Sequence, residues 1–252
     1  MPDHLAPATV ELPPGIRACL FDLDGVLTRT AITHEAAWAQ MFDEFLVGRG
    51  GISARPFTRD DYNTALDGKP RDDGIRAFLA SRGIELPEGE IDDEPGAPTV
   101  RGLGARKNQL FLQRLATEGV DVYDGSVQFV HAVRTAGMHT VCVSSSANAE
   151  QVLDAAHLGE LFDARIDGNV AREHLLRGKP APDTFLAGAT AVRTPPEHAA
   201  VFEDALAGVA AGHAGGFGLV VGVDRVHHRE ALLAHGADVV VDDLAELLGS
   251  GS

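Results

Sequence analysis

Residues 19–30 read CLFDLDGVLTRT, and two carboxylates, Asp22 and Asp24, stand at the end of the apolar run that begins at Ile16. Side chains two positions apart on a strand point to the same face. Both carboxylates would then project together from the tip of one strand, where their charges repel. This pair is the feature that the rest of the sequence has to account for.

Composition limits the classes of protein to consider. The chain has 252 residues, 44% hydrophobic and 23% charged, as in ordinary soluble globular proteins. Its formal net charge of −16 argues against a nucleic-acid partner, because phosphate backbones are bound by Lys and Arg. The first residues lack a signal peptide's pattern, and no segment is apolar enough to span a membrane. Two cysteines in apolar runs, Cys19 and Cys142, indicate buried thiols in a cytoplasmic protein.

Short apolar runs that alternate with amphipathic stretches predict an α/β fold. Helical spacing occupies residues 127–136, 151–158 and 183–192, between the runs. Strands that alternate with helices form a doubly wound, Rossmann-like parallel sheet. The expected strands are Ile16–Phe21, Thr140–Val143, Phe162–Ile166, Ala199–Phe202, Leu219–Val223 and Val239–Val241.

The gap between the first two strands is too long for one crossover and predicts an inserted domain. We expect a core domain of residues 1–31 and 122–252 and a helical cap domain of residues 32–121. Helical patterns cover Thr33–Leu46 and Asn108–Glu118. The acidic stretch Glu85–Gly104, with four Gly and three Pro, is predicted to be a loop that interrupts the cap.

Polar side chains follow the predicted strands at the edge of the sheet where ligands of open α/β folds bind. They are Asp22, Asp24, Ser144, Ser146, Glu203 and Asp204, joined by Lys179 in a Gly-Lys-Pro turn. Carboxylates crowded around one point require a cation, and Mg²⁺ prefers oxygen ligands. We therefore predict a Mg²⁺ site formed by Asp22, Asp24, Glu203 and Asp204. Among these, Asp22 and Asp204 are the first choices for direct side-chain ligands.

These carboxylates, hydroxyl groups and Lys179 are the groups that phosphoryl transfer requires. Lys179, the Ser144 hydroxyl and backbone N–H groups near Gly25 would meet the oxygens of a phosphoryl group. Asp22 is expected to attack phosphorus and form an aspartyl-phosphate. Asp24 would then protonate the leaving oxygen and later take a proton from the incoming hydroxyl.

The motifs DLDGVLT, VSSS, GKPAPD and FEDALAG resemble those of the haloacid dehalogenase superfamily, over residues 16–225. The helical insert is similar to that of its β-phosphoglucomutase-like subfamily. The resemblance implies interconversion of β-glucose 1-phosphate and glucose 6-phosphate through glucose 1,6-bisphosphate, and we expect a monomer. It also implies substrate-binding roles for Thr30, His34, Gly68, Arg71, Lys107, Asn108, Ser146 and Asn148. In this resemblance Arg71 binds the distal phosphate of the substrate.

Three positions depart from the subfamily's pattern, namely Arg29, Gly74 and Ala147. They weaken the assignment of the sugar substrate. The core motifs are shared with a Mg²⁺-dependent sugar-phosphate phosphatase, in which water takes the phosphoryl group from Asp22, so this enzyme is the nearest alternative. A receiver-type signalling module, whose Asp is phosphorylated beside Mg²⁺, is a remote alternative because such modules lack an inserted cap.

Overall fold

The computed structural model describes residues 9–50 and 55–249, and these divide into two compact units. The first contains residues 9–29 and 121–249, and the second contains residues 30–50 and 55–120. Within the described residues, no helix has the length and apolar character needed to cross a membrane.

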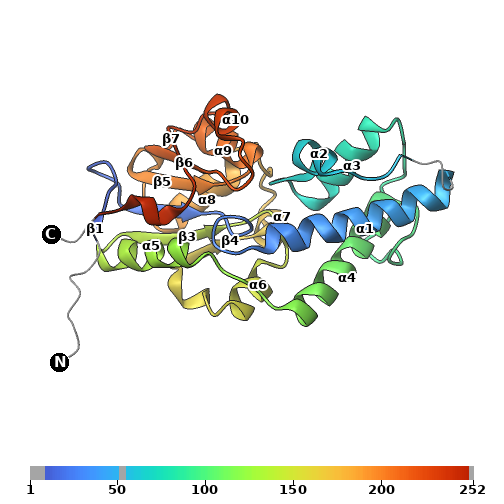
Figure 1. Cartoon of the computed structure of the whole chain (residues 1–252), viewed down its shortest axis with the longest axis horizontal. Helices are drawn as coiled ribbons and strands as arrows, with labels where there is room; N and C mark the ends of the chain where they lie inside the picture. The colour runs from blue at the N-terminus through green and yellow to red at the C-terminus, as the bar shows by residue number, and fades with distance from the viewer. Residues whose placement is uncertain (1–8, 51–54, 250–252) are drawn as a thin grey trace. The chain divides into compact units, whose positions relative to one another are not determined.

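The first unit is built on a six-stranded parallel sheet (Figure 1), which confirms the predicted α/β class. The strand order is β4-β3-β2-β5-β6-β7, so β2 lies in the interior of the sheet between β3 and β5. A short antiparallel pair, β1 with β8, was not predicted. The strands are β1 (Thr9–Val10), β2 (Ala18–Phe21), β3 (His139–Val143), β4 (Ala164–Ile166), β5 (Ala199–Glu203), β6 (Leu219–Val223), β7 (Val239–Val241) and β8 (Leu248–Gly249).

Helices cover both faces of this sheet. They are α5 (Asp124–Thr135), α6 (Ala149–Ala155), α7 (Gly168–Glu173), α8 (Asp183–Ala191), α9 (Leu206–Ala214) and α10 (Arg229–Ala234). On one face, α8 to α10 pack on the side chains around Leu20 and Val201. On the other face, Phe129 of α5 packs edge-on against Phe21, and Phe21 stacks on Phe202 at 4.6 Å. Alternating residues of β2 therefore serve opposite faces of the core.

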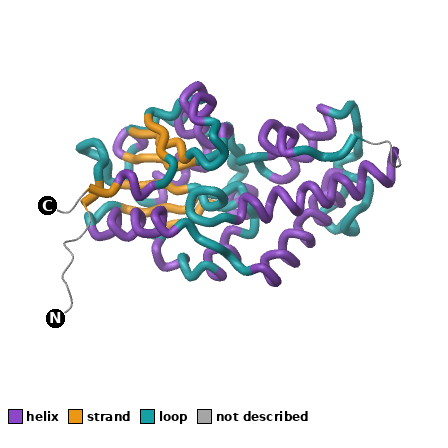
Figure 2. The backbone as a smooth tube through the Cα atoms, viewed as in Figure 1, coloured by secondary structure: helices purple, strands orange, loops and turns teal. Residues whose placement is uncertain are grey.

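The second unit is helical, and its described residues include no strand. Figure 2 shows its helices in purple joined by teal loops. They are α1 (Thr30–Gly50), α2 (Arg59–Asp61), a π-helical turn (Tyr62–Leu66), α3 (Arg71–Ser81) and α4 (Val100–Glu118). Phe42 of α1 lies at the centre of an aromatic cluster, with ring centroids 4.0 Å from Phe78 and 5.5 Å from Phe57. This unit therefore has a hydrophobic core of its own.

The predicted loop at 85–104 is wrong at its carboxyl end, because α4 already begins at Val100. Thr99 caps this helix by accepting a hydrogen bond from Gly102 N. Gly102 allows the helix to pack closely against the preceding segment, since an added Cβ would lie 2.5 Å from Ala97 O. Glycine and proline in this stretch suggested a loop, whereas two of the glycines are helical residues at crowded contacts.

Candidate functional site

The first carboxylate pair lies where the sequence predicts it, directly after β2. Asp22 N extends the parallel ladder by donating to Phe202 O at 3.0 Å, and the Asp22 side chain is buried. Gly25 then turns the chain with a φ of +97°. A Cβ on Gly25 would lie 1.9 Å from Asp204 Oδ2, so only glycine allows this approach. The turn therefore brings the backbone after Asp24 against the acid that follows β5.

Lys179 connects the ends of three strands. Its Nζ donates to Asp22 Oδ1 at 2.5 Å, to Glu203 Oε1 at 2.6 Å and to Val143 O at 3.1 Å. Lys179 and Glu203 are almost fully buried. Such a cation is stable in the interior only because all three of its donors meet acceptors. The Gly-Lys-Pro turn therefore brings Lys179 to the edge of the sheet where Asp22 and Glu203 lie, and its catalytic role stays a prediction.

Electrostatics couples these groups. Burial raises the pKa of Asp22 well above its usual range, and the nearby charges of Glu203 and Asp24 raise it further, while Lys179 acts in the opposite direction. Burial opposes the charged form of Lys179, but the carboxylates of Asp22 and Glu203 outweigh burial and hold its pKa above the ordinary value. The site therefore carries an excess of carboxylates around one ammonium group.

The serine motif after β3 reaches the same edge of the sheet. Ser144 Oγ donates to Asp24 Oδ2 at 3.4 Å and accepts from Ser146 N at 3.0 Å. Ser146 Oγ in turn accepts from Asn148 N at 3.2 Å. Ser144 is buried, so its hydroxyl is directed by these contacts rather than by solvent. The predicted hydroxyl groups and Asp24 thus form one connected network.

The donor set fits a hard divalent cation. Asp22, Glu203 and Asp204 each offer a carboxylate oxygen, and these atoms lie within 4.8 Å of one another. Both oxygens of Glu203 already accept hydrogen bonds, one from Lys179 and one from Ala205 N at 2.9 Å. We therefore expect Asp22 and Asp204 to be the direct side-chain ligands. The Asp24 carboxylate is not in this cluster of described residues, and its metal role stays a prediction.

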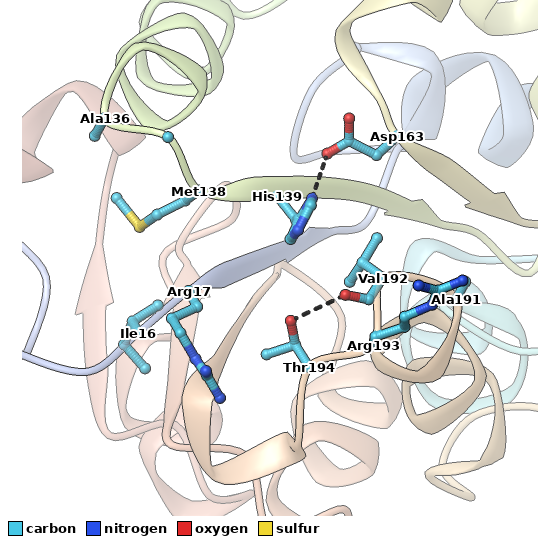
Figure 3. Close-up of a pocket in the computed structure, with 11 residues that line it drawn as sticks. Ile16, Arg17, Ala136, Met138, His139, Asp163, Ala191, Val192, Arg193 and Thr194 are labelled. Atoms are coloured by element: carbon cyan, nitrogen blue, oxygen red, sulfur yellow. Dashed lines mark hydrogen bonds and ion pairs between the residues drawn. The ribbon is translucent and has the colours of Figure 1, made fainter.

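A separate cleft opens at the other edge of the sheet, where the strands begin (Figure 3). It has a volume of about 720 Å³, and Arg17, His139 and Arg193 are among its lining residues. His139 Nδ1 lies 3.3 Å from Asp163 Oδ2 in its wall. Since its lining includes none of the predicted site residues, we assign the chemistry to the carboxyl ends of the strands.

Comparison with known proteins agrees with this geometry. A family model described as haloacid dehalogenase-like hydrolase matches residues 16–216. The chain is 50% identical to a β-phosphoglucomutase of Mycobacterium bovis over 244 residues, which cover 94% of this chain and 93% of the relative.

The chain belongs to the haloacid dehalogenase superfamily, in its β-phosphoglucomutase-like subfamily.

Other members of the superfamily are similar over the same length. The chain is 27% identical to a validoxylamine A 7′-phosphate phosphatase of Streptomyces hygroscopicus, over 92% of this chain and 95% of the relative. A crystal structure of β-phosphoglucomutase from Clostridium difficile has the same fold, with a TM-score of 0.73, 24% identity and coverage of 92% and 93%. Named relatives of this superfamily enzyme thus include both a mutase and a phosphatase.

Within the helical unit, helix α4 carries two polar pairs. Arg71, at the start of α3, donates from Nη2 to Asn108 Oδ1 at 2.8 Å. Lys107 Nζ hydrogen-bonds His34 Nδ1 of α1, and the His34 ring stacks on Phe111 at 4.0 Å. This contact joins α4 to α1. Four residues predicted from the superfamily resemblance therefore meet in pairs.

Three further residues singled out in the sequence also lie in the helical unit. Gly68 has a φ of +71°, which favours glycine, and lies in the turn before α3. Thr30 is buried as the first residue of α1. Gly74 lies against Leu66, because an added Cβ would come 2.9 Å from the methyl group Cδ2 at the end of that side chain.

Sequence reasoning missed the polar residues after β6. Asp224 and Arg225 follow this strand at the same edge of the sheet, yet neither was predicted to belong to the site. Arg225 donates from Nε to Gly25 O at 2.9 Å, inside the turn that follows Asp24. The rule that led to Asp22, Ser144 and Glu203 points to this loop, because Asp224 directly follows the buried parallel strand and Arg225 is the next residue.

Proposed function

We propose that this chain is a Mg²⁺-dependent β-phosphoglucomutase that interconverts β-glucose 1-phosphate and glucose 6-phosphate. In the first half, the 6-hydroxyl oxygen of β-glucose 1-phosphate attacks the phosphorus of phosphorylated Asp22 while Asp24 takes the hydroxyl proton, so glucose 1,6-bisphosphate forms and Asp22 is released. In the second half, Asp22 attacks the phosphorus at the 1-position, the bond from that phosphorus to the sugar oxygen breaks, and Asp24 gives that oxygen the proton. Glucose 6-phosphate leaves, and the aspartyl-phosphate is formed again.

Residues of the core orient the phosphoryl group. Lys179 is held in the interior by Asp22, Glu203 and Val143, so its charge is positioned before substrate arrives. The Ser144 hydroxyl donates a hydrogen bond to Asp24 at the carboxyl ends of the strands, the same edge of the sheet as Lys179. Such preorganised donors stabilise charge that develops on the transferring group. A bound Mg²⁺, held by Asp22 and Asp204, would neutralise phosphoryl oxygens.

The observation that carries the mutase assignment is the pair of cationic side chains beside helix α4. A mutase has to hold a bisphosphate at both ends, whereas a phosphatase needs one phosphate site. Arg71 donates to the side-chain oxygen of Asn108, and Lys107 hydrogen-bonds His34, so helix α4 and the start of α3 bring two basic side chains into the helical unit. We propose that Arg71 binds the distal phosphate. The 50% identity to a named β-phosphoglucomutase supports this choice.

A sugar-phosphate phosphatase is the second candidate, because the core chemistry is shared and one full-length relative is named a phosphatase. The reaction products distinguish the mutase from the phosphatase. Purified protein is given β-glucose 1-phosphate, Mg²⁺ and a trace of glucose 1,6-bisphosphate. We expect glucose 6-phosphate to form much faster than inorganic phosphate. Release of inorganic phosphate alone would assign the phosphatase instead.

A further inference from the structure

Arg225, the second residue after β6, holds the turn that follows Asp24. Its Nε donates to Gly25 O at 2.9 Å, and its Nη2 lies 3.4 Å from Val26 O. Its Nη1 donates to Asp242 O at 2.7 Å, and Nη2 also reaches Ser126 Oγ at 3.3 Å. The side chain is 13% exposed. One guanidinium group thus joins the turn at 25–26 to two other segments of the core.

A ring contact fixes the plane of this guanidinium. Arg225 Cζ lies 3.6 Å from the centroid of the Tyr123 ring, and Arg29 Cζ lies 4.3 Å from the same centroid. Tyr123 N donates to Leu27 O at 2.9 Å, so the ring is attached to the turn that Arg225 binds. A planar guanidinium that is stacked and hydrogen-bonded has little freedom to rotate. Arg29, which departs from the subfamily's pattern, is here a second cation on one aromatic ring.

The turn itself lies against the catalytic groups. Gly25 follows Asp24 in the chain, and its Cα is in close contact with the Asp204 carboxylate, because an added Cβ would lie 1.9 Å from Oδ2. Gly25 N donates to Thr28 O at 2.7 Å, which closes the turn. The carbonyl that Arg225 binds belongs to the peptide between Gly25 and Val26, one residue after Asp24, so a displacement of this turn would shift the backbone that carries Asp24.

We propose that Arg225 is a positioning residue that holds Asp24 in the direction needed for general acid–base catalysis. This inference rests on the phosphoryl-transfer function proposed above. It predicts a specific defect. Loss of Arg225 should slow steps in which Asp24 must move a proton and should spare steps in which the leaving group departs without one.

Arg229 provides a matched control, because it binds the same carboxyl-terminal segment without contacting the turn. Its Nη2 donates to Asp242 Oδ1 at 2.7 Å, and its Nη1 donates to Val240 O. Substitution of either arginine by glutamine loses contacts to 240–243. Only Arg225→Gln loses contacts to Gly25 and Val26. Thermal unfolding of both variants shows how much each loss destabilises the fold.

The test is single-turnover transfer to Asp22 from two donors, with Mg²⁺ present. p-Nitrophenyl phosphate has a leaving group that needs no proton, whereas glucose 1,6-bisphosphate leaves a sugar oxygen that does. We expect Arg225→Gln to slow transfer from the bisphosphate by about 10–100-fold, within the range of general acid catalysis. Transfer from p-nitrophenyl phosphate should change by less than about threefold, the spread usual for context effects, and Arg229→Gln should leave the ratio of the two rates at its wild-type value.

An equal fall for both donors in Arg225→Gln would make Arg225 a residue of the fold only and would overturn the proposal, as would unchanged rates for both. Where Arg225→Gln does not fold, Arg225→Lys keeps the charge but loses the stacked, forked donor, and the same ratio decides. Wild-type protein that takes no phosphoryl group from either donor overturns the proposed function itself, and the role of Arg225 with it.

Discussion

Lys179 Nζ lies 2.6 Å from Glu203 Oε1, although the Glu203 side chain is completely buried. A Cβ on Gly208 would lie 1.9 Å from the carboxyl carbon of Glu203, so a glycine makes room for that group. The carboxylate therefore has a fixed place, and the ammonium group of Lys179 takes its direction from it. We regard Glu203 as the residue that orients Lys179 toward Asp22.

Glu203→Gln should consequently reduce activity through Lys179. The amide keeps the shape of the side chain but not its charge, so among the described residues Asp22 remains as the carboxylate bound to Lys179. We expect kcat to fall by about 10–100-fold, the size of a lost charge-assisted contact. Asp163→Asn, at the opposite edge of the sheet, is the control and should retain wild-type kcat. Equal activity of Glu203→Gln and wild type would show that Lys179 needs no orienting carboxylate.

Arg71 is predicted to matter more for the mutase reaction than for hydrolysis. Arg71→Ala removes one charge-assisted contact to the distal phosphate, worth about 1.5–3 kcal/mol, so kcat/KM for glucose 6-phosphate formation should fall by about 10–150-fold. Slow release of inorganic phosphate should change much less. Arg101→Ala, another arginine of the helical unit, is the control. If both rates fall together, Arg71 supports the fold of the helical unit instead.

Metal dependence follows from the carboxylate cluster. Chelation should abolish activity and Mg²⁺ should restore it, while Asp204→Asn should raise the Mg²⁺ concentration needed for half-maximal rate. Ca²⁺ should inhibit, because its longer bonds and looser geometry misplace the phosphoryl group. Titration calorimetry of Mg²⁺ into wild type and Asp204→Asn provides a readout independent of activity. Full activity in excess chelator is incompatible with the proposed site.

Asp61 provides a test of stability in the helical unit. Burial alone would raise the pKa of Asp61, but hydrogen bonds from Thr58 and Arg82 outweigh it and hold the pKa below its ordinary value. The stabilisation is thus complete above the unfolded-state pKa of about 3.9 and is lost as pH falls through the lower folded-state pKa. Asp61→Asn should lower the free energy of unfolding by about 1–3 kcal/mol at pH 7.

Urea unfolding of wild type and Asp61→Asn at pH 7 and at about pH 3 checks this. The difference between the two proteins should shrink at the acidic pH. Glu118→Gln, which weakens an exposed ion pair with Arg114, should change stability by less than about 0.5 kcal/mol and is the control. A constant difference at both pH values would mean that charge on Asp61 contributes nothing.

The strands and the core site could be predicted because each depends on a local pattern. A buried apolar run followed by polar residues places Asp22, Ser144 and Glu203 at one edge of the sheet without knowledge of other contacts. The weak strand β4 was found the same way, although only Ala164–Ile166 of the predicted stretch is strand. Local patterns were therefore sufficient for the strands of the six-stranded sheet and for these groups at its edge, whereas the polar residues after β6 were overlooked.

Long-range contacts account for what was missed. Arg225 is 200 residues from Gly25 in the chain, and its role depends on β6 returning to the same edge as β2. The pair of β1 with β8 joins the two ends of the described chain, and neither two-residue strand has a pattern of its own. The start of α4 was misplaced because glycine appears as a helix breaker in sequence but as a packing residue at Gly102.

The central claim is that Asp22 carries the phosphoryl group between two sugar positions. The most direct measurement is to mix the protein with Mg²⁺ and glucose 1,6-bisphosphate labelled with ³²P, stop the reaction within one turnover and locate the label by mass spectrometry. We predict an acyl phosphate on Asp22 that is discharged by added β-glucose 1-phosphate to form glucose 1,6-bisphosphate. A label on another residue, no label, or discharge only to water would contradict the account.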